Sequence, residues 1–241
     1  MAKETLAEEN VRGTTCLVII AHPDDAEFTV AGTVARWVKD GARVVYVVCT
    51  DGSRGSNEPD KPPEVMKPLR HKEQQAAARV LGVQEVIFLD YEDGSLEPSM
   101  ELRRDLTRLI RRYRPDVVIC QDPSGLFRGN SYVNHPDHRA AGEAALYAIF
   151  PSACTRFVFR EMLAEGLEPH KVREIYLYGS EQPDTWVDIS ETISLKVEAL
   201  KAHRSQVKPD YADARLQSWN GELGRRHGVA YAEEFKRVVL S

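Results

Sequence analysis

The sequence predicts an α/β protein: a Rossmann-like, doubly wound and mostly parallel sheet with a C-terminal embellishment. Two observations support this prediction. Short apolar runs rich in β-branched residues alternate four times with segments of helical periodicity, the pattern of a parallel sheet with right-handed crossovers. After residue 150 the alternation becomes irregular, and a length of 241 residues suits one sizeable domain with a buried core. We therefore expect a single domain over residues 1–241.

The expected elements follow in chain order. Each predicted strand is a short apolar run bounded by turn residues, and the first four lie at 16–21, 43–50, 85–89 and 116–121. Each predicted helix repeats apolar residues every three to four positions, and the first four lie at 28–40, 69–81, 99–114 and 137–150. Residues 51–68 are polar and rich in Gly, Ser and Pro, so we expect a long loop there, either functional or disordered.

Beyond Pro151 the expected elements are less regular. Strands are predicted at 154–160, 173–178 and 185–189. Ser190 is expected to cap a helix whose apolar face carries Ile193, Val197 and Leu200. Residues 211–241 are expected to be helical and then extended.

Composition argues against several classes of protein. The net charge is -5, from 32 Lys and Arg against 37 Asp and Glu, so nothing favours a polyanionic partner. The Arg-rich stretch 103–114 has apolar residues at helical spacing, which indicates the solvated face of a packed helix. No apolar run approaches the roughly 18 residues of a membrane span, and residues 1–15 lack the apolar core of a signal peptide. We expect a cytoplasmic protein without nucleic-acid or membrane partners, with its four cysteines reduced.

Two short motifs carry the chemistry. Residues 21–28 read Ala-His-Pro-Asp-Asp-Ala-Glu-Phe after the first predicted strand, and residues 134–140 read Asn-His-Pro-Asp-His-Arg-Ala before a predicted helix. Both lie in strand-to-helix loops. Open α/β sheets place their sites at the carboxyl ends of parallel strands, where neighbouring strands leave a crevice. We therefore expect the potential metal ligands of both motifs to meet at one edge of the sheet.

The residue types in these motifs suit metal-assisted hydrolysis. His22 and Asp25 are three residues apart in a tight turn, so they can act as two arms of a chelate, with His138 as the third. Two imidazoles and one carboxylate with an open position form a typical catalytic zinc shell, which activates water and polarises a carbonyl oxygen. Asp24 is then free to act as general base. His135 is placed to stabilise an oxyanion or to act as a second acid.

These motifs also carry a resemblance. The chain resembles the LmbE-like N-deacetylase superfamily, also called the PIG-L family, whose members show an AHPDD-type motif after the first strand and an HPDH-type motif in the second half. The resemblance covers nearly the whole chain and extends to four further blocks: Thr50-Asp51-Gly52, Arg70 with Glu73, Leu81-Gly82 and His203-Arg204-Ser205-Gln206. It implies a zinc-dependent hydrolase that removes acetyl from an N-acetylglucosaminyl group.

The resemblance also implies roles for individual residues. His22, Asp25 and His138 would be the zinc ligands, Asp24 the general base, and His135 the stabiliser of the transition state. One zinc ion per chain is implied, with Fe²⁺, Co²⁺ or Mn²⁺ as alternatives. Family members commonly form homo-oligomers, often trimers or hexamers.

Further positions are implied less directly. Arg70 and Asp93 match positions where sugar-processing relatives hold the substrate. Some relatives place a mobile Tyr two residues before the first His of the second motif; that position is Val133 here, and Tyr132 lies one residue earlier. Asp137 is expected to orient one of its flanking imidazoles, because metal-site histidines are usually hydrogen-bonded on their other nitrogen.

Alternatives remain open from the residues alone. Arg70 and Glu73 have helical spacing and suit a structural salt bridge. His71, His170 and His227 lack ligand neighbours in the sequence and are expected to face solvent. The same metal shell also suits an amidase acting on another amide, such as a cysteinyl conjugate. A sugar-binding or nucleotide-binding domain without turnover is a further alternative, and a Mg²⁺ phosphoesterase fits poorly because Mg²⁺ prefers oxygen ligands.

Overall fold

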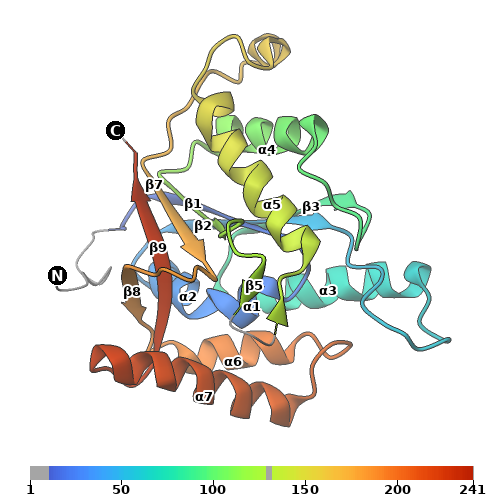
Figure 1. The fold of residues 1–241 in the computed structure, drawn as a ribbon, viewed down its shortest axis with the longest axis vertical. Helices are drawn as coiled ribbons and strands as arrows, with labels where there is room; N and C mark the ends of the chain where they lie inside the picture. Colours follow the sequence, from blue (N-terminus) through green and yellow to red (C-terminus); the bar gives the residue numbers. More distant parts are fainter. Residues whose placement is uncertain (1–10, 129–131, 241) are drawn as a thin grey trace.

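The protein is described by a computed structural model that covers residues 11–128 and 132–240. Its main sheet has seven strands in the order β3-β2-β1-β4-β7-β9-β8 (Figure 1). The bounds of these strands are β1 Thr15–Ile20, β2 Arg43–Thr50, β3 Glu85–Tyr91, β4 Val117–Gln121, β7 Glu174–Tyr178, β8 Thr185–Asp188 and β9 Ala232–Val239. The first five are parallel, whereas β9 runs antiparallel to both of its neighbours. The predicted mostly parallel sheet is confirmed.

Helices cover both faces of the sheet. On one face lie α4 (Met100–Tyr113) and α5 (Pro136–Tyr147). On the other lie α1 (Asp25–Thr29), α2 (Ala31–Lys39), α3 (Pro63–Leu81), α6 (Ile193–Lys201) and α7 (Pro209–His227). Alternate residues of each strand enter the two cores, as pleating requires: Val18 and Ile20 pack toward α2, and Leu17 and Ile19 toward α4 and α5.

Several helix boundaries differ from the prediction. The predicted helix 28–40 is two helices, because Val30 leaves the helical conformation at φ -121° and ψ 2°. Helix α3 begins at Pro63 and continues through Pro68, so the loop predicted at 51–68 ends at residue 62. A proline in a helix removes one hydrogen bond, which is why Pro68 suggested a boundary. Thr192, and not Ser190, is the N-cap of α6.

The strand predicted at 154–160 is wrong. Turns occupy this segment, and a 3₁₀ helix, η3 (Arg160–Glu165), follows a π-helical segment, η2 (Ala148–Ala153). The guanidinium of Arg111, which is buried, donates to the carbonyls of Ser152, Thr155 and Val158. These carbonyls are therefore satisfied by a side chain and not by a neighbouring strand.

The loop between β4 and α5 contains a two-stranded hairpin, β5 (Phe127–Arg128) with β6 (Tyr132–Val133). The C-terminal part is helical and then extended, as predicted, although residue 241 lies outside the described residues. None of the helices in the described ranges combines the length and hydrophobicity needed to cross a bilayer.

Candidate active site

The two motifs meet where the winding of the sheet reverses. Strands β1 and β4 are neighbours, and the chain leaves β1 for the face covered by α1 but leaves β4 for the face covered by α5. Such a switch point opens a crevice at the carboxyl ends of the strands. Gly142 allows α5 to lie close to β4, because a Cβ there would be 2.3 Å from the carbonyl oxygen of Gln121. Residues 22–25 and 135–138 therefore face each other across this crevice.

The backbone of Asp24 separates the two adjacent carboxylates. Asp24 has φ 98° and ψ -21°, a left-handed conformation that typically costs a non-glycine residue about 1–3 kcal/mol. Its N–H donates to Oε1 of Gln74 at 2.9 Å, and its carboxylate meets Nη2 of Arg70 at 3.2 Å. Burial raises the pKa of Asp24 to about 6, although the charge of Arg70 acts to lower it. The side chain of Asp24 is thus directed away from Asp25.

Asp25 turns back toward the end of β1. Its Oδ2 accepts hydrogen bonds from the N–H groups of Ala21 (3.1 Å) and His22 (2.8 Å), and its Oδ1 lies 3.0 Å from Nε2 of His138. Burial acts to raise the pKa of Asp25, but the bonds and charges of His138 and His22 outweigh it and hold the pKa well below its usual value. The carboxylate is ionised, as a metal ligand must be.

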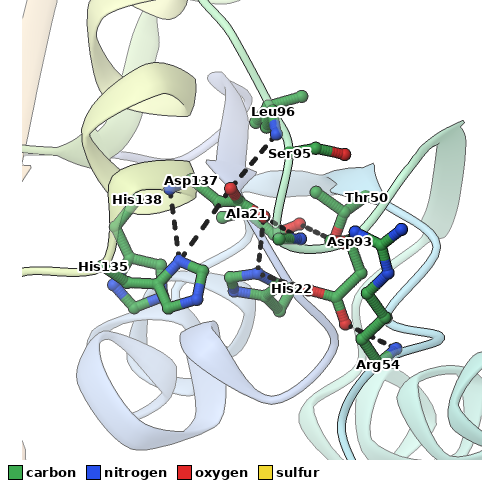
Figure 2. A network of polar contacts seen from close by, with 12 residues as sticks. Ala21, His22, Thr50, Arg54, Asp93, Ser95, Leu96, His135, Asp137 and His138 are labelled. Atoms are coloured by element: carbon green, nitrogen blue, oxygen red, sulfur yellow. Dashed lines mark hydrogen bonds and ion pairs between the residues drawn. The ribbon is translucent and has the colours of Figure 1, made fainter.

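His22 lies at the centre of the site (Figure 2). Its Nε2 is 3.1 Å from Oδ1 of Asp93 and 3.1 Å from Oδ2 of Asp137. Two carboxylate acceptors on one nitrogen assign the proton of the neutral ring to Nε2, so Nδ1, which faces Asp25, carries the lone pair. Burial acts to lower the pKa of His22, but the nearby carboxylates of Asp137, Asp25 and Asp93 raise the pKa well above its usual value.

Asp137 links three segments of the chain. Its carboxylate is fully buried and accepts hydrogen bonds from the N–H groups of Gly94 (2.7 Å) and Leu96 (3.1 Å), in addition to contacting His22. We expected this carboxylate to orient an imidazole of its own motif, but the structure places it against His22 of the first motif. The backbone N–H of Asp137 donates to Nδ1 of His135 at 3.2 Å.

His135 is the more exposed histidine of the second motif. It is the N-cap residue of α5, and because its Nδ1 accepts the N–H of Asp137, the proton of the neutral ring is on Nε2. The ring centre lies 4.8 Å from that of His22 and 5.3 Å from that of His138. Burial and the nearby His22 lower the pKa of His135, so the ring is a neutral hydrogen-bond donor at pH 7.

The donor set fits a transition metal. His22, Asp25 and His138 each offer one ligand atom, and these atoms lie within 4.8 Å of one another. Two nitrogens and one oxygen suit zinc and its neighbours in the first transition row. His22, His135 and Asp137 meet the same distance limit, but both oxygens of Asp137 already accept backbone N–H groups. Asp25 accepts its two backbone bonds on Oδ2, so the first set is the better metal site.

Arg70 lies at the floor of the crevice and contacts other residues of the protein. Its Nη1 donates to the carbonyl of Gly52 at 3.0 Å and lies 3.8 Å from Oδ2 of Asp93. The alternative of a salt bridge with Glu73 is wrong, because the carboxylate of Glu73 accepts from the N–H (2.8 Å) and Oγ (2.6 Å) of Ser205. Arg70 thereby fixes the loop after β2 against the site.

Two adjoining hollows surround the metal site. The first, of about 340 Å³, contains all of the predicted ligands together with Asp24, Arg54, Arg70, Asp93 and His135. Arg54, from the long loop that follows β2, donates its backbone N–H to Oδ2 of Asp93 at 2.9 Å. The second hollow, of about 620 Å³, shares Asp25, Phe28 and His138 with the first. Tyr132 lines only this second hollow, half-exposed on the β5-β6 hairpin.

Comparison with known proteins agrees with this geometry. The family described as PIG-L, GlcNAc-PI de-N-acetylase, matches residues 17–149, which include both motifs. The chain is 32% identical over 229 residues to diacetylchitobiose deacetylase of Thermococcus kodakarensis, covering 92% of this chain and 82% of the relative. The chain belongs to the PIG-L family. The resemblance seen in the sequence is therefore confirmed.

Other PIG-L family relatives extend the comparison. The solved structure of N,N'-diacetylchitobiose deacetylase from Pyrococcus horikoshii, in complex with an inhibitor, matches with a TM-score of 0.86 at 32% identity. This match covers 94% of the present chain and 84% of that chain. A probable N-acetyl-alpha-D-glucosaminyl L-malate deacetylase of Bacillus anthracis is 29% identical, covering 85% of this chain and 87% of the relative. These relatives are named deacetylases, which are hydrolases of N-acetyl amide bonds.

One buried network of this PIG-L family chain was missed in the sequence. Nε2 of Gln74 donates to both carboxylate oxygens of Glu27 at 3.1 and 3.2 Å, and Glu27 lies 3.1 Å from Nε2 of His203. All three side chains are fully buried, and Gln74 also accepts the N–H of Asp24. The sequence signal was the charged Glu27 within the first motif, together with His203 in a further family block.

The remaining histidines of the PIG-L family chain have structural roles. The prediction that His227 faces solvent is wrong, because its ring stacks on Trp186 at 4.6 Å and contacts Glu234 at 2.7 Å. His170 contacts the carbonyl of Pro115 at 2.7 Å, and His71 stacks on Phe88.

Proposed function

We propose that this chain is a metal-dependent N-deacetylase that hydrolyses the acetamide of an N-acetylglucosamine conjugate. The observation that carries the proposal is the position of Asp24. A carboxylate beside a ligand carboxylate, turned away from it by a left-handed backbone and open to the same hollow, suits a general base. A domain that only binds sugar has no use for it. The deacetylase names of the relatives support the same reaction.

We propose zinc as the metal, one ion per chain, held by His22, Asp25 and His138. When bound, it supplies a Lewis acid that activates water and polarises the amide carbonyl. Fe²⁺, Co²⁺ and Mn²⁺ suit the same ligands, and metal analysis distinguishes them. Asp137 and Asp93 hold the ring of His22 with Nδ1 directed at the metal site.

The other residues handle protons and position the substrate. Asp24 takes a proton from the attacking water and passes it to the leaving amine, so acetate and a free amine are released. His135 donates its Nε2–H to the carbonyl oxygen as negative charge develops there. Arg70 and Asp93 are proposed to contact sugar hydroxyls from the floor of the first hollow, and Tyr132 from the adjoining second hollow.

Three broader proposals accompany the reaction. Residues 1–241 would form a single domain, in a cytoplasmic protein. Homo-oligomers, as trimers or hexamers, are proposed from the family resemblance. The substrate would be a small N-acetylated sugar conjugate.

The proposal is tested by metal content and amine release. Protein as purified should carry about one metal per chain, and fluorescamine should detect free amine from N-acetylglucosamine conjugates until a chelator is added. Asp24→Asn should keep the metal and lose nearly all turnover, whereas the matched surface variant Asp105→Asn should keep both. Intact activity in Asp24→Asn would refute the assignment of the base. Amine release only from other amides, such as a cysteinyl conjugate, would favour the alternative amidase.

A further inference from the structure

The segment between α6 and α7, residues 202–208, carries a block of sequence that the proposed reaction does not use. The block reads His203-Arg204-Ser205-Gln206. We infer that His203 is a positioning residue for the hydrolysis, and that it acts through two buried side chains, Glu27 and Gln74, on the backbone of the proposed general base. The inference rests on the proposed function, because Asp24 is a base only in that reaction.

The backbone of Asp24 needs a restraint from outside its own turn. Its left-handed conformation, at φ 98°, is one that a residue with a Cβ rarely adopts. Oε1 of Gln74 accepts the N–H of Asp24 at 2.9 Å, and Nη2 of Arg70 lies 3.2 Å from the carboxylate. Because the direction of the side chain follows from the backbone, the bond to Gln74 helps to fix where the carboxylate points. The position of this acceptor therefore bears on the position of the base.

The amide of Gln74 has two orientations that fill the same space, and Glu27 selects one of them. Nε2 of Gln74 donates to both carboxylate oxygens of Glu27 at 3.1 and 3.2 Å. A carboxylate accepts hydrogen bonds but donates none, so the NH₂ group must face it and Oε1 faces the N–H of Asp24. The reversed amide would place its oxygen against the carboxylate and its NH₂ group against that N–H, and both contacts repel.

His203 completes the hydrogen bonding of the Glu27 carboxylate. Its Nε2 lies 3.1 Å from Oε2 of Glu27, and both side chains are fully buried. A buried carboxylate needs donors from the protein, because it has lost its contacts with water. Burial acts to lower the pKa of His203, but the hydrogen bond and the charge of Glu27 outweigh it and raise the pKa above its usual value. Without this donor, the carboxylate is less firmly held, and so is the amide of Gln74.

A further contact ties this segment to the helix that carries Gln74. The carboxylate of Glu73 accepts the N–H of Ser205 at 2.8 Å and its hydroxyl at 2.6 Å. Glu73 precedes Gln74 in α3, so His203 and the amide that it influences are held against the same helix. The hydrogen bonds run from His203 to the N–H of Asp24 and do not include the proposed metal ligands. A defect in this network should therefore lower turnover and leave metal binding intact.

A second buried pair allows positioning to be separated from stability alone. Lys196 donates to Glu233 at 2.6 Å, and both side chains are buried. Lys196 also donates to the carbonyl of Thr29, the last residue of α1, at 3.1 Å. This pair joins the C-terminal part of the chain to α1, as His203 does, but these hydrogen bonds do not lead to Asp24. Lys196→Met is therefore the matched control.

The first test compares turnover in matched variants, with the methyl glycoside of N-acetylglucosamine as the probe. Nε2 of a glutamine reaches about as far as Nε2 of an imidazole, whereas the amide of asparagine is one methylene shorter. His203→Asn should therefore lower kcat about 10- to 100-fold with KM and metal content nearly unchanged, and His203→Gln should restore most of it. Lys196→Met should lower the midpoint of thermal unfolding but keep the wild-type kcat per bound metal.

The variants also define the results that would refute the positioning role. An unchanged kcat in His203→Asn would do so, as would equal losses in His203→Asn and His203→Gln. The same loss of kcat in Lys196→Met would show that turnover follows stability, which contradicts the inference. If His203→Asn does not fold, His203→Met, which is close to glutamine in shape but has no donor, gives the same comparison.

The second test reads the backbone of Asp24 without turnover. Amide hydrogen exchange, followed by NMR, should be about tenfold faster at Asp24 in His203→Asn than in the wild type. The amide of Thr50, which donates to the carbonyl of Ala21 at 2.8 Å, should be unchanged. Equal acceleration at both amides, or none at Asp24, would refute the positioning role even if the wild type is an active hydrolase. Faster exchange at Asp24 alone, in a protein that releases amine from no conjugate, would support the network and refute the proposed hydrolase.

Discussion

Replacing Asp137 by Asn tests whether this buried carboxylate sets up the metal site. Three donors converge on it: the N–H groups of Gly94 and Leu96 at 2.7 and 3.1 Å, and Nε2 of His22 at 3.1 Å. Asparagine fills the same volume but has one acceptor oxygen and an NH₂ group. Whichever way the amide is oriented, at least one buried donor then faces another donor.

The magnitude follows from these contacts. If the amide oxygen replaces Oδ2, only the N–H of Leu96 is left unpaired; the opposite orientation leaves Gly94 and His22 unpaired. An unpaired buried donor costs about 1–3 kcal/mol, and the loss of charge-assisted bonds adds to this. We therefore expect the free energy of unfolding to fall by about 2–4 kcal/mol in Asp137→Asn. In either orientation His22 also loses its charge-assisted contact with residue 137, a loss that typically costs about 10- to 100-fold in metal affinity.

Urea unfolding and competition with a chromogenic zinc chelator measure the two effects separately. Asp105→Asn is the matched control, because Asp105 bonds to the hydroxyl of Tyr91 at a partly exposed position away from the crevice. The control should change unfolding by less than about 1 kcal/mol and leave zinc affinity intact. A folded Asp137→Asn protein with the zinc affinity of the wild type would refute the role assigned to this carboxylate.

Three further predictions follow from other contacts. Gln74→Met removes the acceptor of the Asp24 N–H, so kcat should fall about 10- to 100-fold with KM and metal content nearly unchanged; an equal loss of metal would contradict this. Zinc at 100 times its Kd should stabilise the wild type by about 2.7 kcal/mol, and thermal melts of His138→Ala should lose this increment. Burial acts to raise the pKa of Glu174, but bonds from Arg237 and Tyr176 outweigh it, so the folded pKa lies below the ordinary 4.5. This stabilisation is present above pH 4.5 and is lost as the pH falls through the folded pKa. The stability difference between wild type and Glu174→Gln, about 1–2 kcal/mol at pH 6 in urea unfolding, should therefore shrink below pH 4.

The sequence was most informative where one local pattern determines structure. Buried parallel strands are short apolar runs, so the predicted strand 43–50 matches β2 and the two motifs were placed correctly at strand ends. The strand prediction for residues 154–160 failed because the apolar residues of this segment do not pack in the sheet. Phe157 is 80% exposed, and a guanidinium from α4 satisfies the nearby carbonyls.

Local sequence patterns could not predict the contacts between segments that are distant in the chain. Asp137 binds His22 from a position 115 residues away, and His203 reaches Glu27 across 176 residues. Neither separation follows the periodicity of a helix or a strand. The residue types of the metal ligands were therefore predictable from the sequence, but the residues that orient those ligands were not. The left-handed backbone of Asp24 was hidden for the same reason, since it depends on Gln74 from another helix.

The antiparallel strand β9 anchors the C-terminal segment within the main sheet. It is inserted between β7 and β8, so the chain end is anchored inside the sheet rather than at its edge. Helix α7 lies between α6 and β9 in the chain. It contributes side chains to the second hollow but none to the predicted metal ligands. Substitutions on this one helix would therefore alter the lining of the second hollow and leave the predicted metal ligands, which follow β1 and β4, unchanged.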